Sequence, residues 1–553
     1  MTDRSFSVMV AVLLGAMAWM MVFSIEAESQ TWDEAMHLAA GYSYWKTGDY
    51  RLNPEHPPLG KLLNAIPLLF LDVPLPVQHP AWIDNDEFRF GQQFLYKSTY
   101  SAGDLLFRAR MVTVAITLLF GLCLALWTRS KFSSEIAIAA LGFYCFDPTV
   151  IAHGRYITSD LLIAFTSFLA AIAWLWWTER PGTHRLMIAG IALGLAMASK
   201  YSWPFLLPVF VCVGLWRKVP VKRLVLSMVV QLLVGGMVVA LVYAPQAAKL
   251  IPATQGYRKA HPDTVLLSKA LEGTYESKTM LGRAATAVSG RLGIQAHPYL
   301  LGIVKHAGHA QLGHSAYLLG KVSDFGWWYY FPVAFVVKEP VGLLLAVAFC
   351  VAALFGDRVK FEPALQLAAV VMVIYWGLAM TANINIGYRH LLPVLPFLYV
   401  AVATLLHGRW PSILVACLLL QAGETVWRHP YHLAFFNVLV GGPEKGGNYL
   451  ADSNIDWGQD LKRLRVWKET YAAKDKLCIA YFGGAPLEYF GMTGRAVPHS
   501  DDAATVDCFA AVSVTLLVGA YEGREAYAWL RGREPLVRIG YSIYVYDLRG
   551  LKR

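Results

Sequence analysis

The sequence predicts an α-helical membrane protein that crosses the bilayer many times. Of its 553 residues, 56% are hydrophobic and 16% are charged, whereas soluble domains carry about 25% charged residues. The mean hydropathy is +0.43. These values exclude a disordered chain and argue against a large soluble enzyme. We therefore expect the net charge of +10 in loops beside a membrane, and we predict no nucleic-acid partner.

About eleven stretches have the apolar character of transmembrane helices, which need about 20 such residues. The first stretch follows Arg4, but it is longer than the apolar core of a signal peptide and ten more follow it, so we interpret it as a retained anchor. The stretches cover residues 6–25, 107–127, 135–153, 159–178, 186–199, 203–216, 224–243, 332–355, 364–382, 391–407 and 410–424.

The basic residues of the short loops predict the orientation. With a cytoplasmic N-terminus, the short outer loops carry only Arg155, Lys200 and Arg389. This asymmetry agrees with the positive-inside rule and predicts an extracytoplasmic C-terminus, in the cytoplasmic membrane. The inner side then carries Arg4, Arg129, Lys131, Arg180, Arg185, Arg217, Lys218, Lys222, Arg223, Arg358, Lys360 and Arg409.

Two domains follow from this topology: a membrane module, residues 1–429, and a small extracytoplasmic α/β domain, residues 430–553. The module has two long outer loops, at 26–106 and 244–331. The tail domain shows the helix and strand patterns of residues 458–472, 477–482, 508–518, 524–531 and 536–546.

Cys478 and Cys508 are the two cysteines of the tail, among seven in the chain. Both would face an oxidising compartment, so we predict a disulfide between them. Two buried thiols on neighbouring strands are the alternative. No CxxC or Cys/His spacing of a metal site occurs.

Acidic residues open the first outer loop, with Asp33 and Glu34 at the start of a helical stretch that ends at Lys46. An acid at this position is a favourable charge for a helix N-terminus. It can also act as a general base if an acceptor hydroxyl comes within hydrogen-bond reach. Both interpretations remain open from the residues alone. His56, held between Pro54 and Pro57, has a rigid position suited to orienting a ligand.

The basic residues of the outer loops have two interpretations. Arg155, Lys200 and Arg389 can extend to the membrane interface with no further role. Alternatively they form a cluster that binds an anion such as phosphate. Lys338 lies one or two turns inside the eighth apolar stretch, where a charge costs about 3 kcal/mol and usually faces a partner or a cavity.

Metal binding is weakly indicated. The second outer loop contains His297, His306, His309 and His314, without reinforcing ligands at regular spacing. The acidic run at 452–460 fits turns and helix caps and lacks the spacing of an EF-hand. We predict no metal site and no required cofactor, while a divalent ion is left open.

These motifs resemble the GT-C membrane glycosyltransferases that use polyprenyl-phosphate sugars, in particular the protein O-mannosyltransferase and lipid A aminoarabinose transferase group. The resemblance covers residues 1–245 and rests on Asp33-Glu34, on His56 to Lys61, on Arg155 to Asp160 and on the stretch ending at Lys200. Further along, Lys338 and the stretch 387–393 resemble bacterial members of this class.

The resemblance implies that Asp33 is the catalytic base, with Glu34 beside it and His56, Asp160 and His390 in support. The donor phosphate would be held by Arg155, Lys200, Arg389 and Lys338. The expected reaction transfers a sugar, with inversion, to a hydroxyl of a glycan, lipid or protein at the outer membrane surface. Eukaryotic protein mannosyltransferases carry a β-trefoil in a loop, whereas this chain ends in an α/β tail, which puts a protein acceptor in doubt.

A secondary transporter or flippase for a lipid-linked or anionic substrate is the alternative function. Such folds often contain internal repeats, and none is visible in this sequence. The sequence also lacks the phosphate-binding loop of ATP-driven transporters, GxxxxGK[ST].

Overall fold

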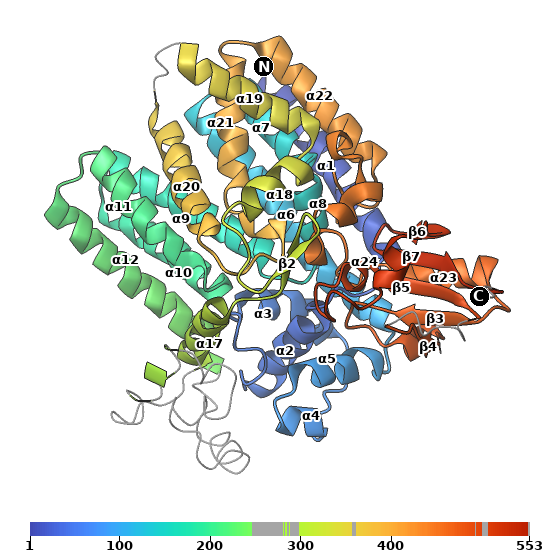
Figure 1. The fold of residues 1–553 in the computed structure, drawn as a ribbon. Coiled ribbons are helices and arrows are strands. Elements are labelled where there is room, and N and C mark those ends of the chain that lie inside the picture. Colours follow the sequence, from blue (N-terminus) through green and yellow to red (C-terminus); the bar gives the residue numbers. More distant parts are fainter. Residues whose placement is uncertain are drawn as a thin grey trace.

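The computed structural model describes residues 1–245, 280, 283–284, 287, 298–356, 361–492, 494–499 and 507–550. Its helices form a bundle, and the tail packs beside one end of that bundle against helices of the first outer loop (Figure 1). The predicted residues His297, Arg358 and Lys360 lie outside the described part.

Each predicted apolar stretch contains helical structure. Within the described residues, five helices are long and apolar enough to cross a membrane, or six if a bent pair counts as one span. The other helices are shorter, so the predicted count of eleven is not established. The bundle helices are α1 (Asp3–Ala27), α6 (Ala102–Lys131), α7 (Ser134–Cys145), α8 (Pro148–His153), α9 (Asp160–Glu179), α10 (Thr183–Ser199), α11 (Leu206–Trp216), α12 (Val221–Val242), α18 (Tyr330–Lys338), α19 (Val341–Gly356), α20 (Pro363–Met380), α21 (Leu395–His407) and α22 (Pro411–Trp427).

Two predicted spans are interrupted, and proline explains both breaks. The predicted span 332–355 is wrong as a single helix, because α18 and α19 meet at an angle of 118°. Pro340 has no N–H and forces Glu339 into an extended conformation, with ψ 142°. The predicted span 135–153 divides in the same way before Pro148, where the Asp147 carboxylate caps α8 by accepting from two backbone N–H groups.

Small residues allow close packing of α10 and α12. A Cβ at Gly194 would lie 2.9 Å from the Cα of Gly235, and one at Gly190 would lie 2.7 Å from the Cβ of Val234. Larger side chains at these positions would push the two helices apart.

Four helices of the first loop cover the end of the bundle beside the tail (Figure 1). The helices are α2 (Glu34–Thr47), α3 (Leu59–Ala65), α4 (Pro80–Ile83) and α5 (Glu87–Tyr96). The second loop contributes α17 (Pro298–Leu312) and the hairpin of β1 (Ala316–Leu318) and β2 (Lys321–Ser323).

The tail is an α/β domain with a five-stranded mixed sheet in the order β4-β3-β5-β7-β6. Strand β3 is parallel to β4 and β5, whereas β7 is antiparallel to β5 and β6. The elements are α23 (Leu461–Tyr471), β3 (Leu477–Ala480), β4 (Arg495–Ala496), β5 (Phe509–Ser513), α24 (Val514–Leu517), α25 (Ala528–Arg531), β6 (Val537–Ile539) and β7 (Ile543–Asp547).

The predicted strand 536–546 is wrong as one element, because it folds as the hairpin of β6 and β7. Gly540 and Tyr541 have φ values of +58° and +66°. Consecutive residues with positive φ reverse the chain in tight hairpins. The predicted strand was too long because the alternation of apolar residues continues across this turn.

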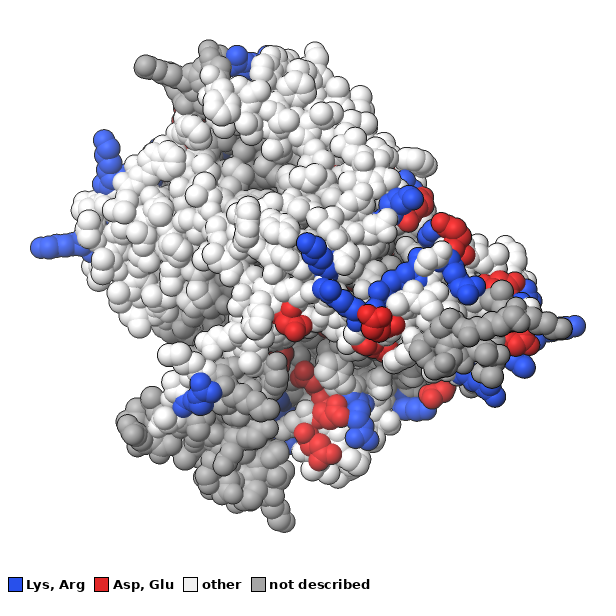
Figure 2. Space-filling model, viewed as in Figure 1, with Lys and Arg blue, Asp and Glu red and all other residues white. Residues whose placement is uncertain are grey.

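Charged side chains gather on the tail and along its boundary with the first loop, while the visible face of the helix bundle is nearly free of them (Figure 2). This distribution agrees with a multi-pass membrane protein whose bundle faces lipid.

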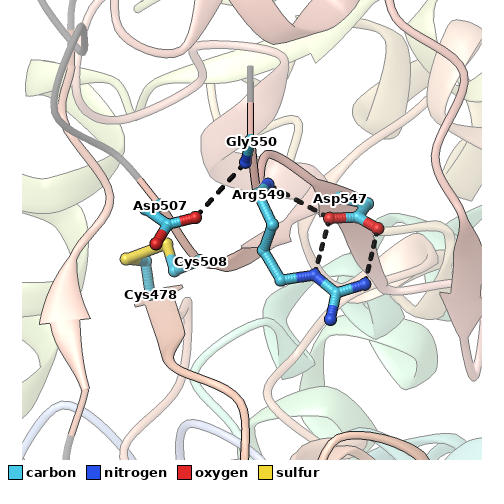
Figure 3. The surroundings of a disulfide bond; sticks show 6 residues. All are labelled: Cys478, Asp507, Cys508, Asp547, Arg549 and Gly550. Carbon is cyan, nitrogen blue, oxygen red and sulfur yellow. Dashed lines mark hydrogen bonds and ion pairs between the residues drawn. A yellow bond between two sulfur atoms is a disulfide. The ribbon is translucent and has the colours of Figure 1, made fainter. Parts of the chain in front are cut away.

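The predicted disulfide between Cys478 and Cys508 is confirmed (Figure 3). It joins β3 to the residue before β5 and closes a sequence separation of 30 residues. The bond therefore links the two central parallel strands of the sheet.

We expect Cys478→Ser to lower the free energy of unfolding of the tail by about 2–4 kcal/mol, because the unfolded chain loses its cross-link. Thermal unfolding of the purified protein, with and without reductant, measures this effect. Cys212→Ser is the control, since Cys212 is a free and exposed cysteine. An equal shift in both variants would contradict the prediction.

Candidate active site

A cavity of about 1010 Å³ opens where the first loop, the bundle and the tail meet. Six of the nine predicted site residues line it, namely Asp33, His56, Asp160, Lys200, Arg389 and His390. The other three, Glu34, Arg155 and Lys338, do not line it. The structure thus divides the predicted residues into two groups.

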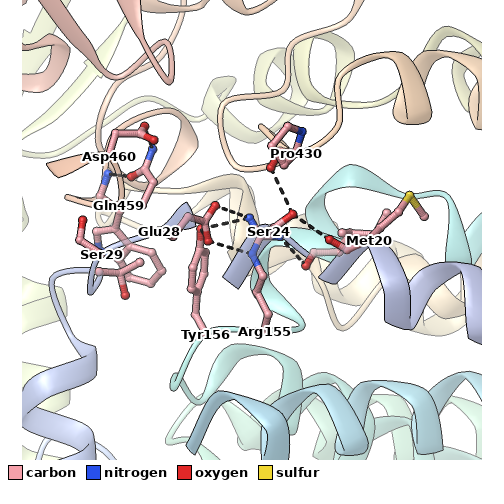
Figure 4. A network of polar contacts seen from close by, with 12 residues as sticks. Met20, Ser24, Glu28, Ser29, Arg155, Tyr156, Pro430, Gln459 and Asp460 are labelled. Atoms are coloured by element: carbon pink, nitrogen blue, oxygen red, sulfur yellow. Dashed lines mark hydrogen bonds and ion pairs between the residues drawn. The ribbon is translucent and has the colours of Figure 1, made fainter. Parts of the chain in front are cut away.

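Glu28 and Arg155 form a buried ion pair outside the cavity lining. The Glu28 carboxylate accepts from Arg155 Nη2 at 2.7 Å, from Arg155 Nε at 3.0 Å and from the Tyr156 hydroxyl at 3.0 Å (Figure 4). The side chains of Arg155 and Glu28 are 0% and 1% exposed. Arg155 is therefore occupied by a carboxylate, and we do not retain it as a ligand for the donor phosphate.

Glu34 forms a second buried ion pair, with Arg110. Its carboxylate accepts from Arg110 Nε at 2.8 Å and from Arg110 Nη2 at 2.5 Å. It also accepts from the N–H groups of Thr31, at 2.7 Å, and Ile157, at 3.1 Å. Through these bonds Glu34 ties the start of α2 to α6 and to the segment that follows α8.

Asp33, which lies between Glu28 and Glu34 in the sequence, lines the cavity. It occupies the N-cap position of α2, but its side chain makes no capping hydrogen bond. Burial raises the pKa of Asp33 to about 6, and the carboxylates of Asp160 and Asp452 act in the same direction. The cations of Arg389 and Lys200 partly oppose this shift. The geometry therefore favours a proton acceptor over a helix cap.

Lys200 and Arg389, which we call the cation pair, meet at Asp160. Lys200 Nζ lies 2.5 Å from Asp160 Oδ1, and Arg389 Nε lies 3.4 Å from Asp160 Oδ2. Arg389 Nη1 is buried and has no hydrogen-bond partner among the described residues. One carboxylate thus orients two cations and leaves guanidinium hydrogens available for an anion.

The tail holds Arg389 in place, a role that the sequence analysis missed. The guanidinium carbon of Arg389 lies 4.2 Å from the centre of the Trp457 ring. The N–H of Tyr388, the preceding residue, donates to Asn454 Oδ1 at 2.8 Å. Ser453 Oγ donates to the carbonyl of Ile386 at 2.7 Å. Three contacts from the segment 453–457 therefore fix the loop that carries the arginine.

Lys338 is buried beside this segment and outside the cavity. Its Nζ donates to the carbonyls of Asn454, at 2.6 Å, and Leu433, at 2.9 Å. It also lies 4.6 Å from the centre of the Phe436 ring. The lysine ties the break between α18 and α19 to the tail, so its contacts favour positioning over binding of the donor.

His37 is a cavity residue that the sequence analysis did not single out, although it follows Asp33 by four residues on α2. Its Nδ1 lies 2.9 Å from the carbonyl of Ile157, and its Nε2 has no partner within the described structure. The His37 and His56 rings meet edge to face at 5.1 Å. Burial lowers the pKa of His37 to about 3 and the pKa of His56 well below its usual value. Both rings are therefore neutral and suited to hydrogen bonds with an uncharged group.

Metal ligands do not assemble in the described residues, where no group of three or more His, Cys, Asp or Glu side chains could hold an ion. His306, His309 and His314 line the cavity.

Comparisons with known proteins address the fold and part of the sequence. The family model of the dolichyl-phosphate-mannose-protein mannosyltransferases matches residues 9–246. ArnT from Cupriavidus metallidurans, bound to undecaprenyl phosphate, is similar over 100% of both chains, with 13% sequence identity and a TM-score of 0.50. This chain has the GT-C glycosyltransferase fold.

An oligosaccharyltransferase from Archaeoglobus fulgidus, in complex with Zn and sulfate, is 16% identical. That likeness covers 83% of this GT-C chain and 55% of the other, with a TM-score of 0.39. No curated protein sequence matches the chain. The mannosyltransferase match and the shared fold together support a glycosyltransferase.

We expect Glu34→Gln to lower the free energy of unfolding by about 3 kcal/mol, because it leaves the buried Arg110 cation without a counter-charge. Asp104→Asn is the matched control and should cost less than about 1 kcal/mol, because its ion pair with Arg108 is exposed. Unfolding of both variants in the same detergent tests the difference, and equal losses would refute it.

Proposed function

We propose that this protein transfers a sugar from a polyprenyl-phosphate donor to an acceptor hydroxyl, at the extracytoplasmic face of the cytoplasmic membrane. The observation that carries the proposal is that Asp33, whose side chain makes no capping hydrogen bond, lines the same cavity as the cation pair. The family match and the fold likeness support the donor class, since ArnT was solved with undecaprenyl phosphate.

The donor would enter with its phosphate at the cation pair. Apolar side chains from the bundle line the cavity too, including Ile163, Phe205 and Leu378, and they suit the lipid tail. The phosphate would accept hydrogen bonds from Arg389 Nη1 and Lys200 Nζ. Asp160 keeps both cations in place and limits the net positive charge, so that the product phosphate can leave.

The transfer step follows from these positions. The Asp33 carboxylate takes the proton of the acceptor hydroxyl, and the acceptor oxygen attacks the anomeric carbon. The bond between that carbon and the phosphate oxygen breaks, and its electron pair goes to the phosphate. The cation pair stabilises the charge that grows there. Attack from the face opposite the leaving group inverts the anomeric configuration.

A metal ion is not needed for this scheme. The leaving group is a monophosphate, and the cation pair supplies two positive charges beside it. The competing transporter hypothesis has no comparable support, because the fold likeness is to a glycosyltransferase.

We expect Asp33→Asn to reduce transfer about 10²- to 10⁴-fold, the usual contribution of a general base. Membranes containing lipid-linked sugars provide the assay, with release of polyprenyl phosphate as the readout. Asp84→Asn is the control in the same loop, because Asp84 is exposed and does not line the cavity. Normal turnover by Asp33→Asn would exclude this residue as the base.

The reaction should also depend on pH. The base works only when it is deprotonated, and burial raises the pKa of Asp33 to about 6. The rate of the wild-type protein should therefore be constant well above that pH and fall about tenfold per unit well below it. A rate that is unchanged between pH 5 and pH 7 would contradict this assignment.

We expect Lys200→Ala and Arg389→Ala each to weaken binding of undecaprenyl phosphate at least about tenfold, because each removes a charge-assisted hydrogen bond. Titration of the lipid into the protein in nanodiscs measures the dissociation constant. Lys474→Ala is the control, since Lys474 is exposed and does not line the cavity. Unchanged affinity in both cavity variants would remove the cation pair from the donor site.

A further inference from the structure

Four aromatic side chains form a continuous strip along the cavity wall. Phe88 meets Trp32 edge to face at 5.9 Å, and Trp32 stacks on Phe482 at 5.1 Å. Phe482 in turn stacks on Tyr521 at 5.1 Å, with 11° between the ring planes. All four line the cavity, and the end members Phe88 and Tyr521 are 45% and 37% exposed. We call these four residues the aromatic strip.

The aromatic strip is built jointly by two distant parts of the chain. Trp32 and Phe88 belong to the first loop, whereas Phe482 and Tyr521 belong to the tail. The backbone N–H of Trp32 donates to the backbone carbonyl of Trp457 at 2.9 Å. This hydrogen bond joins the first loop to the tail beside the strip. Trp32, an inner member of the strip, is also the neighbour of Asp33 in the sequence.

Hydrogen bonds fix the tail half of the strip. The Phe482 N–H donates to Ser513 Oγ at 3.0 Å, and the Tyr521 hydroxyl donates to Asp452. The carbonyl of Gly484, two residues after Phe482, accepts from Gln92 Nε2 at 3.0 Å. The wall is therefore formed before a ligand arrives, which reduces the ordering cost of binding.

Most of the charged side chains that line the cavity are acidic. Besides Asp33 and Asp160, the cavity is lined by Glu55, Glu87, Asp452 and Glu522. Among the described lining residues, the only lysine and arginine are the cation pair. Asp160 already neutralises part of their charge. A phosphorylated or otherwise anionic acceptor would meet repulsion along the strip. An uncharged ligand rich in hydroxyl groups would find hydrogen-bond acceptors instead.

We propose that the aromatic strip binds an uncharged saccharide, which is the acceptor of the transferred sugar. Sugar rings combine an apolar C–H face, which packs on aromatic surface, with hydroxyl groups, which donate to carboxylates. The cavity offers both surfaces, and it is also lined by Asp33, which follows Trp32 of the strip in the sequence. This inference rests on the proposed function and names its acceptor class.

A peptide acceptor fits the same wall less well. Extended peptides usually bind by pairing with an exposed strand, and no residue of the described strands lines the cavity. The lining comes from helices and connecting segments. The side-chain chemistry of the strip therefore favours a glycan.

Binding of neutral glycans to the detergent-purified protein tests the inference. The probe is an array of uncharged oligosaccharides of two to six sugar units, together with serine- and threonine-containing peptides and phosphorylated oligosaccharides. Saturation-transfer NMR then gives the affinity of the strongest binder. We expect Phe88→Ala and Phe482→Ala each to weaken that affinity about tenfold, since each removes packed aromatic surface.

Two controls separate this inference from the proposed function. Tyr471→Ala alters an aromatic side chain of the tail that is 73% exposed and does not line the cavity, and it should leave glycan affinity unchanged. Phe88→Ala is the strip variant least prone to unfold, because the ring is at the exposed end. Binding of undecaprenyl phosphate is measured in every variant as a test of the donor site alone.

The outcomes are distinct. A neutral glycan that binds the wild type, is weakened by the strip variants and leaves donor binding intact supports the saccharide site. Binding of undecaprenyl phosphate without any neutral glycan, or preference for the peptides or phosphorylated glycans, overturns it while the proposed function stands. Failure of the wild-type protein to bind undecaprenyl phosphate would overturn the proposed function itself.

Discussion

The structure depends on the burial of two arginine–carboxylate pairs under the first loop. Glu28 with Arg155 and Glu34 with Arg110 take two acids and two bases out of solvent, and each pair is almost completely enclosed. Buried charges are stable only with partners in good geometry, so the pairs fix residues 28–34 against the bundle. Of the three acids Glu28, Asp33 and Glu34, only Asp33 lines the cavity.

The tail is part of the site and not an appendage to it. Residues 29–32 pair with residues 457–459 through backbone hydrogen bonds, and Asn454 and Trp457 hold the loop of Arg389. The same domain supplies half of the aromatic strip. The tail therefore contributes to both the proposed donor side and the proposed acceptor side of the cavity.

Sequence reasoning found apolar helices and the α/β tail from periodicity, and it found the disulfide from the oxidising compartment expected for the tail. The six cavity residues were named from loop position and from the resemblance to GT-C transferases. It could not separate Lys200 and Arg389 from Arg155 and Lys338, since all four are basic residues near apolar stretches. Their partners decide their roles, and Glu28 lies 127 residues from Arg155. Pro148 and Pro340 could have signalled the broken spans, and the spacing of His37 from Asp33 could have marked that residue, but the sequence analysis used neither signal. The tail's contribution depends on tertiary contacts that no local pattern records.

The joining of the first loop to the tail also sets an order of assembly. The cavity wall begins at Trp32 and ends at Glu522, so nearly the whole chain must be synthesised before that wall exists. During translation the bundle can insert while Asp33 still lacks Trp457, Phe482 and Tyr521 around it. A nascent or C-terminally truncated chain would hold an open and solvated carboxylate, without the burial that raises its pKa. On the proposed function, the site is therefore complete only after the tail has folded onto the first loop.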